Sequence, residues 1–283
     1  MAGTVTKKPV MKRTLNQERS VFAMAREIKP QGQRQVKEPG ALAGQVALVT
    51  GGAVRLGQAI TLALAREGCR VAIHYHRSAD AARATAREVQ RLGSEAKLIR
   101  GDIADPAVAR KLVAETVRRW GGLDILVNNA AIFLKTPLLN TTPAQWDRLL
   151  AVNLRGPFFA SQAAAREMVK RKAGRIINIA DVGGVRPWPS YLPYCVTKAG
   201  LLMLTRGLAL ALAPHIQVNG VAPGAVLFPE SFPAQLRQKL RETVPMGREG
   251  SPEDVAAAVV FFATAPSYIT GQVLFVDGGA TAR

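Results

Sequence analysis

The alternation of two kinds of segment constrains the fold of this chain more than any other feature. Short runs of apolar, often β-branched residues alternate with stretches whose apolar residues have helical spacing. We expect strands at residues 46–50, 70–75, 96–100, 125–127, 176–180, 216–221 and 273–276. We expect helices at residues 56–67, 79–92, 106–120, 143–170, 191–212 and 252–264. Apolar strands that alternate with helices predict a parallel sheet covered by helices on both faces.

The number of predicted strands indicates one large domain. Seven parallel strands fit a single α/β domain of the doubly wound Rossmann type, which we place at residues 45–283. The first 44 residues differ, because they hold nine Lys or Arg, three Asp or Glu, and little apolar periodicity after residue 29. We therefore expect residues 1–44 to form a flexible basic arm.

The composition excludes several classes of protein. With 38 Lys and Arg against 20 Asp and Glu, the formal net charge is +18, which is compatible with nucleic-acid binding. The sequence has no helix-turn-helix or aromatic platform motif, so we expect no specific nucleic-acid partner. Two cysteines exclude a disulfide scaffold and a cysteine-built zinc site, so we expect no metal and a reducing, cytoplasmic location. We find no run of about 18 apolar residues and expect no membrane span.

A glycine-rich turn directly follows the first predicted strand and opens a helix. It reads Thr-Gly-Gly-Ala-Val-Arg-Leu-Gly at residues 50–57. Glycines at such a turn let backbone N–H groups approach a pyrophosphate, and the helix N-terminus adds positive potential. We therefore predict a dinucleotide site, with cofactor contacts from Gly51, Arg55, Leu56 and Gly57.

The end of the second predicted strand indicates which dinucleotide binds. An acidic residue there would accept hydrogen bonds from the adenosine ribose of NAD. This chain instead has His76, Arg77 and Ser78. A 2′-phosphate needs a cation and hydroxyl donors, so the pattern favours NADPH over NADH.

Two later strand ends complete the predicted cofactor site. Asp102 and Ile103 follow the third strand, where we expect them to meet the adenine edge. Asn129 and Ala130 follow the fourth strand, where small residues let the backbone approach the cofactor.

A tyrosine and a lysine form the candidate catalytic pair. Tyr194 and Lys198 are four residues apart in a predicted helix, so they share one helix face. A phenol has a pKa of about 10, too high for ready proton exchange at neutral pH. We expect the nearby ammonium and the positive charge of a nicotinamide to lower the pKa of Tyr194 toward working pH.

Taken in order along the chain, these motifs resemble those of the short-chain dehydrogenase/reductase family. The resemblance covers residues 45–279, including Asn153 in a Val-Asn-Leu motif. It implies that Tyr194 is the proton donor and that Lys198 binds the nicotinamide ribose and tunes Tyr194. It also implies that Asn153 helps hold a water that links Lys198 to solvent.

The same resemblance carries further expectations about contacts and assembly. Pro223 and Gly224 would contact the cofactor, and the apolar segment 225–232 would close over the substrate. Relatives of this fold are usually homotetramers, with the helices around residues 143–170 and 191–212 at the interfaces.

Position 181 departs from the usual pattern of the family. The family usually has a serine thirteen residues before the tyrosine, whereas this chain has Asp181. A serine hydroxyl donates to a carbonyl oxygen that gains negative charge during reduction, and an ionised carboxylate would repel that oxygen. Asp181 suits a substrate whose reacting edge carries N–H groups or basic ring nitrogens.

Four features of this chain resemble the pteridine reductase subgroup of the family. They are Asp181, Arg-Leu-Gly at 55–57, His-Tyr-His-Arg-Ser at 74–78, and Phe133 shortly after Asn-Asn-Ala. The resemblance implies a pterin ring sandwiched between the nicotinamide and Phe133. The implied substrate contacts are Arg55, Phe133, Asp181 and Tyr194.

We therefore expect an NADPH-dependent reductase that converts a dihydropterin or dihydrofolate to the tetrahydro form. A broader form of this expectation adds oxidised pterins as substrates. One alternative is a carbonyl or hydroxyl oxidoreductase of the same family, acting on a ketoacyl or sugar-type substrate, for which serine is expected at position 181. Another is a non-catalytic nucleotide-sensing or nucleic-acid-binding protein. The intact Asn153, Tyr194 and Lys198 argue against lost chemistry.

Overall fold

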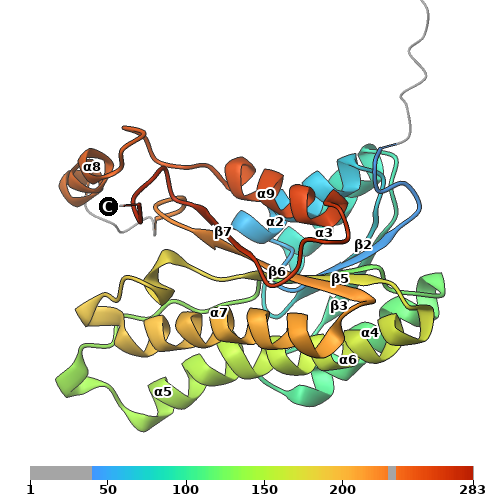
Figure 1. The fold of residues 1–283 in the computed structure, drawn as a ribbon, viewed down its shortest axis with the longest axis horizontal. Helices are drawn as coiled ribbons and strands as arrows, with labels where there is room; N and C mark the ends of the chain where they lie inside the picture. Colours follow the sequence, from blue (N-terminus) through green and yellow to red (C-terminus); the bar gives the residue numbers. More distant parts are fainter. Residues whose placement is uncertain (1–39, 229–233, 283) are drawn as a thin grey trace, which may run out of the picture. The chain divides into compact units, whose positions relative to one another are not determined.

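The computed structural model describes residues 40–228 and 234–282 of the chain. It has a fully parallel seven-stranded sheet in the order β3-β2-β1-β4-β5-β6-β7 (Figure 1). The strands are β1 Val46–Val49, β2 Arg70–Tyr75, β3 Ala96–Arg100, β4 Ile125–Asn128, β5 Gly174–Ile179, β6 Ile216–Pro223 and β7 Val273–Val276. This confirms the predicted doubly wound α/β fold.

Helices cover both faces of the sheet, as predicted. Those on one face are α2 (Arg55–Arg66), α3 (Ala79–Arg91) and α9 (Pro252–Thr264). Those on the other are α4 (Pro106–Trp120), α6 (Gly156–Arg171) and α7 (Leu192–Leu212). In β1, Ala47 and Val49 pack into one apolar core and Val46 and Leu48 into the other. Burial on both faces explains why the strand residues are apolar without alternation.

The helix predicted at residues 143–170 is interrupted in the structure. It divides into α5 (Pro143–Leu150), a π-helical segment (Ala151–Arg155) and α6. Pro157 explains the break, because proline has no N–H to donate to the carbonyl of Asn153 four residues earlier and its ring crowds that carbonyl. Short π segments inside helices often mark functional sites.

Two other boundaries differ from the sequence prediction. Leu42 falls in the predicted arm, yet its side chain is buried in the core and its backbone N–H donates to Glu67. The domain therefore includes residues before position 45, whereas residues 1–39 lie outside the described part of the chain. Helix α8 (Ala234–Thr243) was not predicted, because its sequence is strongly polar.

The segment Pro189–Leu212, which includes α7, is long and apolar enough by length and composition to cross a membrane. In this fold α7 packs against α5, α6 and β6. It also carries the buried polar side chains of Lys198 and Thr205. We therefore interpret α7 as a core helix of the domain.

Candidate active site

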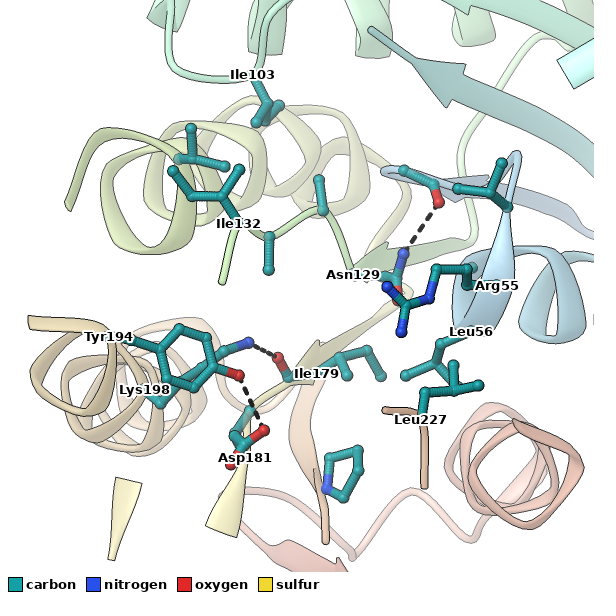
Figure 2. Close-up of a pocket in the computed structure, with 18 of the residues that line it drawn as sticks. Arg55, Leu56, Ile103, Asn129, Ile132, Ile179, Asp181, Tyr194, Lys198 and Leu227 are labelled. Atoms are coloured by element: carbon teal, nitrogen blue, oxygen red, sulfur yellow. Dashed lines mark hydrogen bonds between the residues drawn. The ribbon is translucent and has the colours of Figure 1, made fainter. Parts of the chain in front are cut away.

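A cavity of about 370 Å³ lies at the carboxyl ends of the strands, where the strand order reverses between β1 and β4 (Figure 2). Open α/β sheets bind ligands at this position. The predicted site residues that line the cavity are Gly51, Arg55, Leu56, Gly57, His76, Asp102, Ile103, Asn129, Ala130, Asp181, Tyr194, Lys198, Pro223 and Gly224. The fold thus brings together loops that are far apart in the sequence.

The glycine-rich turn forms a narrow cradle at one end of this cavity. Gly51 has a φ of +61°, a conformation that favours glycine. A side chain at Gly57 would overlap the Gly51 carbonyl and lie 2.6 Å from Nδ2 of Asn129. Arg55, at the start of α2, lines the cavity and donates to the carbonyl of Phe228 at 3.4 Å. Such a cradle fits a pyrophosphate, which needs close contact with backbone.

The end of β2 contributes less to the cavity than predicted. His76 lines it, whereas Arg77 and Ser78 are exposed and are not among the lining residues. The two exposed side chains follow directly after His76, so they lie at the rim of the predicted adenosine end. Of the predicted apolar lid, Val226 and Leu227 line the cavity, and residues 229–232 lie outside the described chain.

Asp102 lines the cavity, but its carboxylate is already engaged. Arg148 of α5 donates to both carboxylate oxygens, at 2.8 and 3.3 Å. The backbone N–H of Ala104 donates to Oδ1 at 3.1 Å. Together these bonds outweigh partial burial and hold the pKa of Asp102 below its usual value. Three of about four acceptor positions are used, so Oδ2 retains capacity for one further donor.

Asp181, Tyr194 and Lys198 converge at the other end of the cavity (Figure 2). The Tyr194 hydroxyl donates to Oδ2 of Asp181 at 2.9 Å, and the backbone N–H of Gly183 donates to Oδ1 at 2.7 Å. The Lys198 ammonium donates to the carbonyl of Ile179 at 2.8 Å. The end of β5 therefore supplies an acceptor for each of the two helical side chains.

Burial dominates the ionisation of this group. It raises the pKa of Asp181, although Lys198 acts in the opposite direction. It lowers the pKa of Lys198 to about 8, against the attraction of Asp181. Both shifts favour the neutral form of a buried group.

The prediction of a lowered pKa for Tyr194 is wrong for this structure. Burial raises the pKa of Tyr194 well above its usual value, and the charge and hydrogen bond of Asp181 raise it further. The sequence identified both Lys198 and Asp181, but it did not show that the fold places the Asp181 carboxylate within hydrogen-bond distance of the phenol. Tyr194 is therefore held as a neutral phenol.

Asn153 lies behind the cavity rather than on its surface. Its side chain accepts from the Ile132 N–H at 2.8 Å and donates to the Ile132 carbonyl at 2.9 Å. It also donates to Thr197 of α7 at 3.3 Å. Asn153 thus ties the π-helical segment to the loop after β4 and to the helix that carries Lys198.

Phe133 is not brought into the cavity lining, contrary to the prediction. Its ring stacks on Tyr191, with centroids 4.4 Å apart and planes 7° apart. Its edge contacts with Trp188 and Tyr194 complete an aromatic cluster beside the cavity. One face of the Phe133 ring is therefore covered by Tyr191.

Several lining residues were not predicted. The polar ones are His74 and Arg148, and the apolar ones include Val54, Ile132, Val152, Ile179 and Ala180. His74 belongs to the motif at 74–78. The sequence of β2 did not reveal that the His74 side chain points toward the cavity. No local signal identified Arg148, because its partner Asp102 is 46 residues away in the sequence.

Comparison with known proteins agrees with this geometry. A family profile described as enoyl-(acyl carrier protein) reductase matches residues 52–281. A 3-oxoacyl-(acyl-carrier-protein) reductase from Synechocystis sp. is 38% identical over 84% of this chain and 98% of its own length. The 3beta-hydroxysteroid dehydrogenase 1 of Eggerthella lenta is 38% identical over 85% of this chain and 95% of its own length.

Solved structures also place the chain among short-chain dehydrogenases/reductases. A double mutant of the Serratia marcescens short-chain dehydrogenase/reductase superposes with a TM-score of 0.80 at 40% identity, over 85% of this chain and 99% of that one. Sequence profile, relatives and fold agree over almost the whole described domain. The chain therefore belongs to the short-chain dehydrogenase/reductase family, whose members are nicotinamide-dependent oxidoreductases.

Proposed function

We propose that this protein is an NADPH-dependent reductase of pterins, acting on a dihydropterin or dihydrofolate. The observation that carries the proposal is the carboxylate of Asp181, which lines the cavity and lies 2.9 Å from the Tyr194 hydroxyl. When ionised, the Asp181 carboxylate can only accept hydrogen bonds, so it favours a substrate edge that presents N–H donors. The amino-pyrimidinone edge of a pterin presents such donors, whereas a simple ketone presents only an acceptor.

The residues around the cavity fit a nicotinamide dinucleotide. The cradle of Gly51 and Gly57 suits the pyrophosphate, and Lys198 suits the nicotinamide ribose. When bound, the reduced nicotinamide would supply the hydride. The end of β2 has no acid to bind a free ribose 2′-hydroxyl, and it presents His76 with Arg77 nearby, which supports NADPH over NADH.

The chain's own residues would supply the proton for the ring nitrogen next to the reduced carbon. Burial and Asp181 keep Tyr194 protonated, so the phenol has a proton to donate. Ready transfer would require its pKa to fall toward working pH, in the direction that the positive charge of a nicotinamide acts. Asp181 would orient the substrate and the phenol together. Lys198 would return a proton to Tyr194 along the helix face that the two share.

A second candidate is reduction or oxidation at a carbonyl or hydroxyl group. The names of the relatives favour it, because they refer to oxoacyl and hydroxysteroid substrates rather than to pterins. For a ketone, however, Asp181 would have to be protonated to donate to the carbonyl oxygen. Burial raises the pKa of Asp181, which acts in favour of that protonated form.

We also propose that the protein forms a homotetramer through α6 and α7. The two helices expose large apolar side chains, among them Phe158 and Val169 on α6 and Met203 and Leu210 on α7. Exposed apolar groups on adjacent helices are typical of association surfaces. Light scattering should give four times the chain mass, and a monomer mass would contradict the proposal.

An NADPH-oxidation assay tests the proposed function. The purified protein is given dihydrobiopterin, dihydrofolate, a ketoacyl thioester and a hydroxysteroid or its ketone in parallel, with NADPH and then NADH. We expect a higher kcat/KM for the dihydropterins than for any carbonyl substrate. A clear preference for the ketoacyl thioester would establish the second candidate instead.

A further inference from the structure

We propose that His74 is a positioning residue that holds the phosphate loop in its binding conformation before the cofactor arrives. The inference rests on the proposed dinucleotide site. His74 lies on β2, its side chain lines the cavity, and the residue is only 2% exposed. Burying a polar imidazole costs desolvation free energy that an apolar side chain at this position would avoid, unless the ring makes hydrogen bonds there.

The imidazole of His74 bridges backbone groups of two different loops. Its Nδ1 accepts from the Gly51 N–H at 3.1 Å, and its Nε2 lies 3.1 Å from the carbonyl oxygen of Gly101. A backbone N–H can only donate and a carbonyl can only accept. The two contacts therefore require a neutral ring with its proton on Nε2.

Gly51 is held from its other side as well. Nδ2 of Asn129 donates to the Gly51 carbonyl at 3.1 Å and to the Thr50 carbonyl at 2.9 Å. The backbone carbonyl of His74 accepts from Gly52 at 3.0 Å. Both polar groups of Gly51, in its left-handed conformation, are thus bonded to side chains from β2 and from the loop after β4.

This arrangement predicts what loss of the ring would do. The Gly51 N–H would lose its acceptor, and the turn could relax away from the geometry that receives phosphate. A loop that is already ordered loses less entropy when the cofactor binds. Burial lowers the pKa of His74, with His76 acting in the same direction and Asp102 and the Gly101 carbonyl opposing it, which agrees with a neutral ring.

Three substitutions separate the two contacts. His74→Asn places an amide oxygen where Nδ1 lies and keeps the bond to Gly51, whereas His74→Gln keeps only a donor toward Gly101 and His74→Leu removes both. The readouts are the NADPH dissociation constant, kcat at saturating NADPH, and the melting temperature. We expect His74→Asn to bind within threefold of wild type, and the other two to bind at least tenfold more weakly with kcat within threefold. Binding by His74→Leu within threefold of wild type, or equal weakening in all three, would overturn the proposal.

A measurement on the unaltered protein covers the case in which the variants do not fold. The chain has three histidines, so ¹⁵N-histidine labelling gives a spectrum that can be assigned. We expect His74 to be neutral with the proton on Nε2 at neutral pH and without cofactor. The opposite tautomer, or a charged ring, would overturn the proposal. If wild-type protein binds no NADPH, the proposed function fails, while the tautomer still reports on the contact with Gly51.

Discussion

The Tyr194 hydroxyl donates a 2.9 Å hydrogen bond to Oδ2 of Asp181, joining the start of α7 to the end of β5. This contact places a carboxylate where the family usually has a hydroxyl donor. It raises the pKa of the phenol and places the Asp181 carboxylate in the lining of the cavity. The chemistry that we propose follows from this pair.

Replacing Tyr194 with Phe tests its role as the proton donor. The ring packing against Phe133 and Trp188 is retained, and only the hydroxyl is lost. We expect kcat/KM to fall at least a hundredfold, in the range of about 10²–10⁴ typical of general acids, with NADPH affinity within threefold of wild type. Turnover close to wild type would sink the assignment.

The pH dependence of kcat/KM should report the ionisation of Lys198. Its pKa is lowered to about 8 by burial, so the ammonium is present below that pH and is lost as the pH rises through it. Because kcat/KM reports the free enzyme, it should fall about tenfold per pH unit above about 8. In Lys198→Arg the fall should disappear, since a guanidinium stays charged. A flat profile in the wild-type protein from pH 7 to 9.5 would exclude this role.

Arg148 should affect cofactor affinity and not the chemical step. Its partly exposed pair with Asp102 fixes the carboxylate at the end of the cavity that we propose for the adenosine. Such pairs contribute up to about 1 kcal/mol, so Arg148→Met should raise the KM for NADPH about threefold to fivefold. Arg155→Met is the matched control, because it removes a bond to the Ala104 carbonyl and none of the three bonds to the Asp102 carboxylate. Equal effects in both variants would argue against a specific role of the pair.

Two helical glycines provide a test of the phosphate cradle. An alanine at Gly57 in α2 would collide with the Gly51 carbonyl, so Gly57→Ala should weaken NADPH binding at least tenfold. At Gly207 in α7 an added carbon meets nothing within 4 Å. Gly207→Ala should bind NADPH normally and raise stability by up to about 1 kcal/mol. Normal NADPH binding by Gly57→Ala would mean that the cofactor does not use this turn.

The sequence was sufficient to predict the sheet, because strands buried on both faces have a local signature. It was sufficient for the loop residues too, since the carboxyl ends of parallel strands meet at one edge. Contacts made by tertiary packing were not predictable. Arg148 reaches Asp102 across 46 residues, and the effect of Asp181 on Tyr194 depends on a distance that no spacing rule gives.

The break between α5 and α6 was missed for a different reason. The apolar periodicity continues through residues 143–170 and predicted one continuous helix. Pro157 indicated a disturbance of that helix, but the prediction followed the periodicity. The resemblance to the pteridine reductase subgroup did not predict the contacts of Phe133. The residue type matches the subgroup, yet in this chain Tyr191 already stacks on its ring.

The most direct test of the account is the substrate preference of Asp181→Ser beside that of the wild-type protein. For each, kcat/KM is measured with a dihydropterin and with a ketoacyl thioester under saturating NADPH. We predict that the wild type prefers the dihydropterin. We also predict that the serine variant loses at least tenfold in pterin reduction, about 1.4 kcal/mol of barrier, while its activity on the ketone rises. Pterin reduction within twofold of wild type in Asp181→Ser, or a wild-type preference for the ketone, would contradict the account.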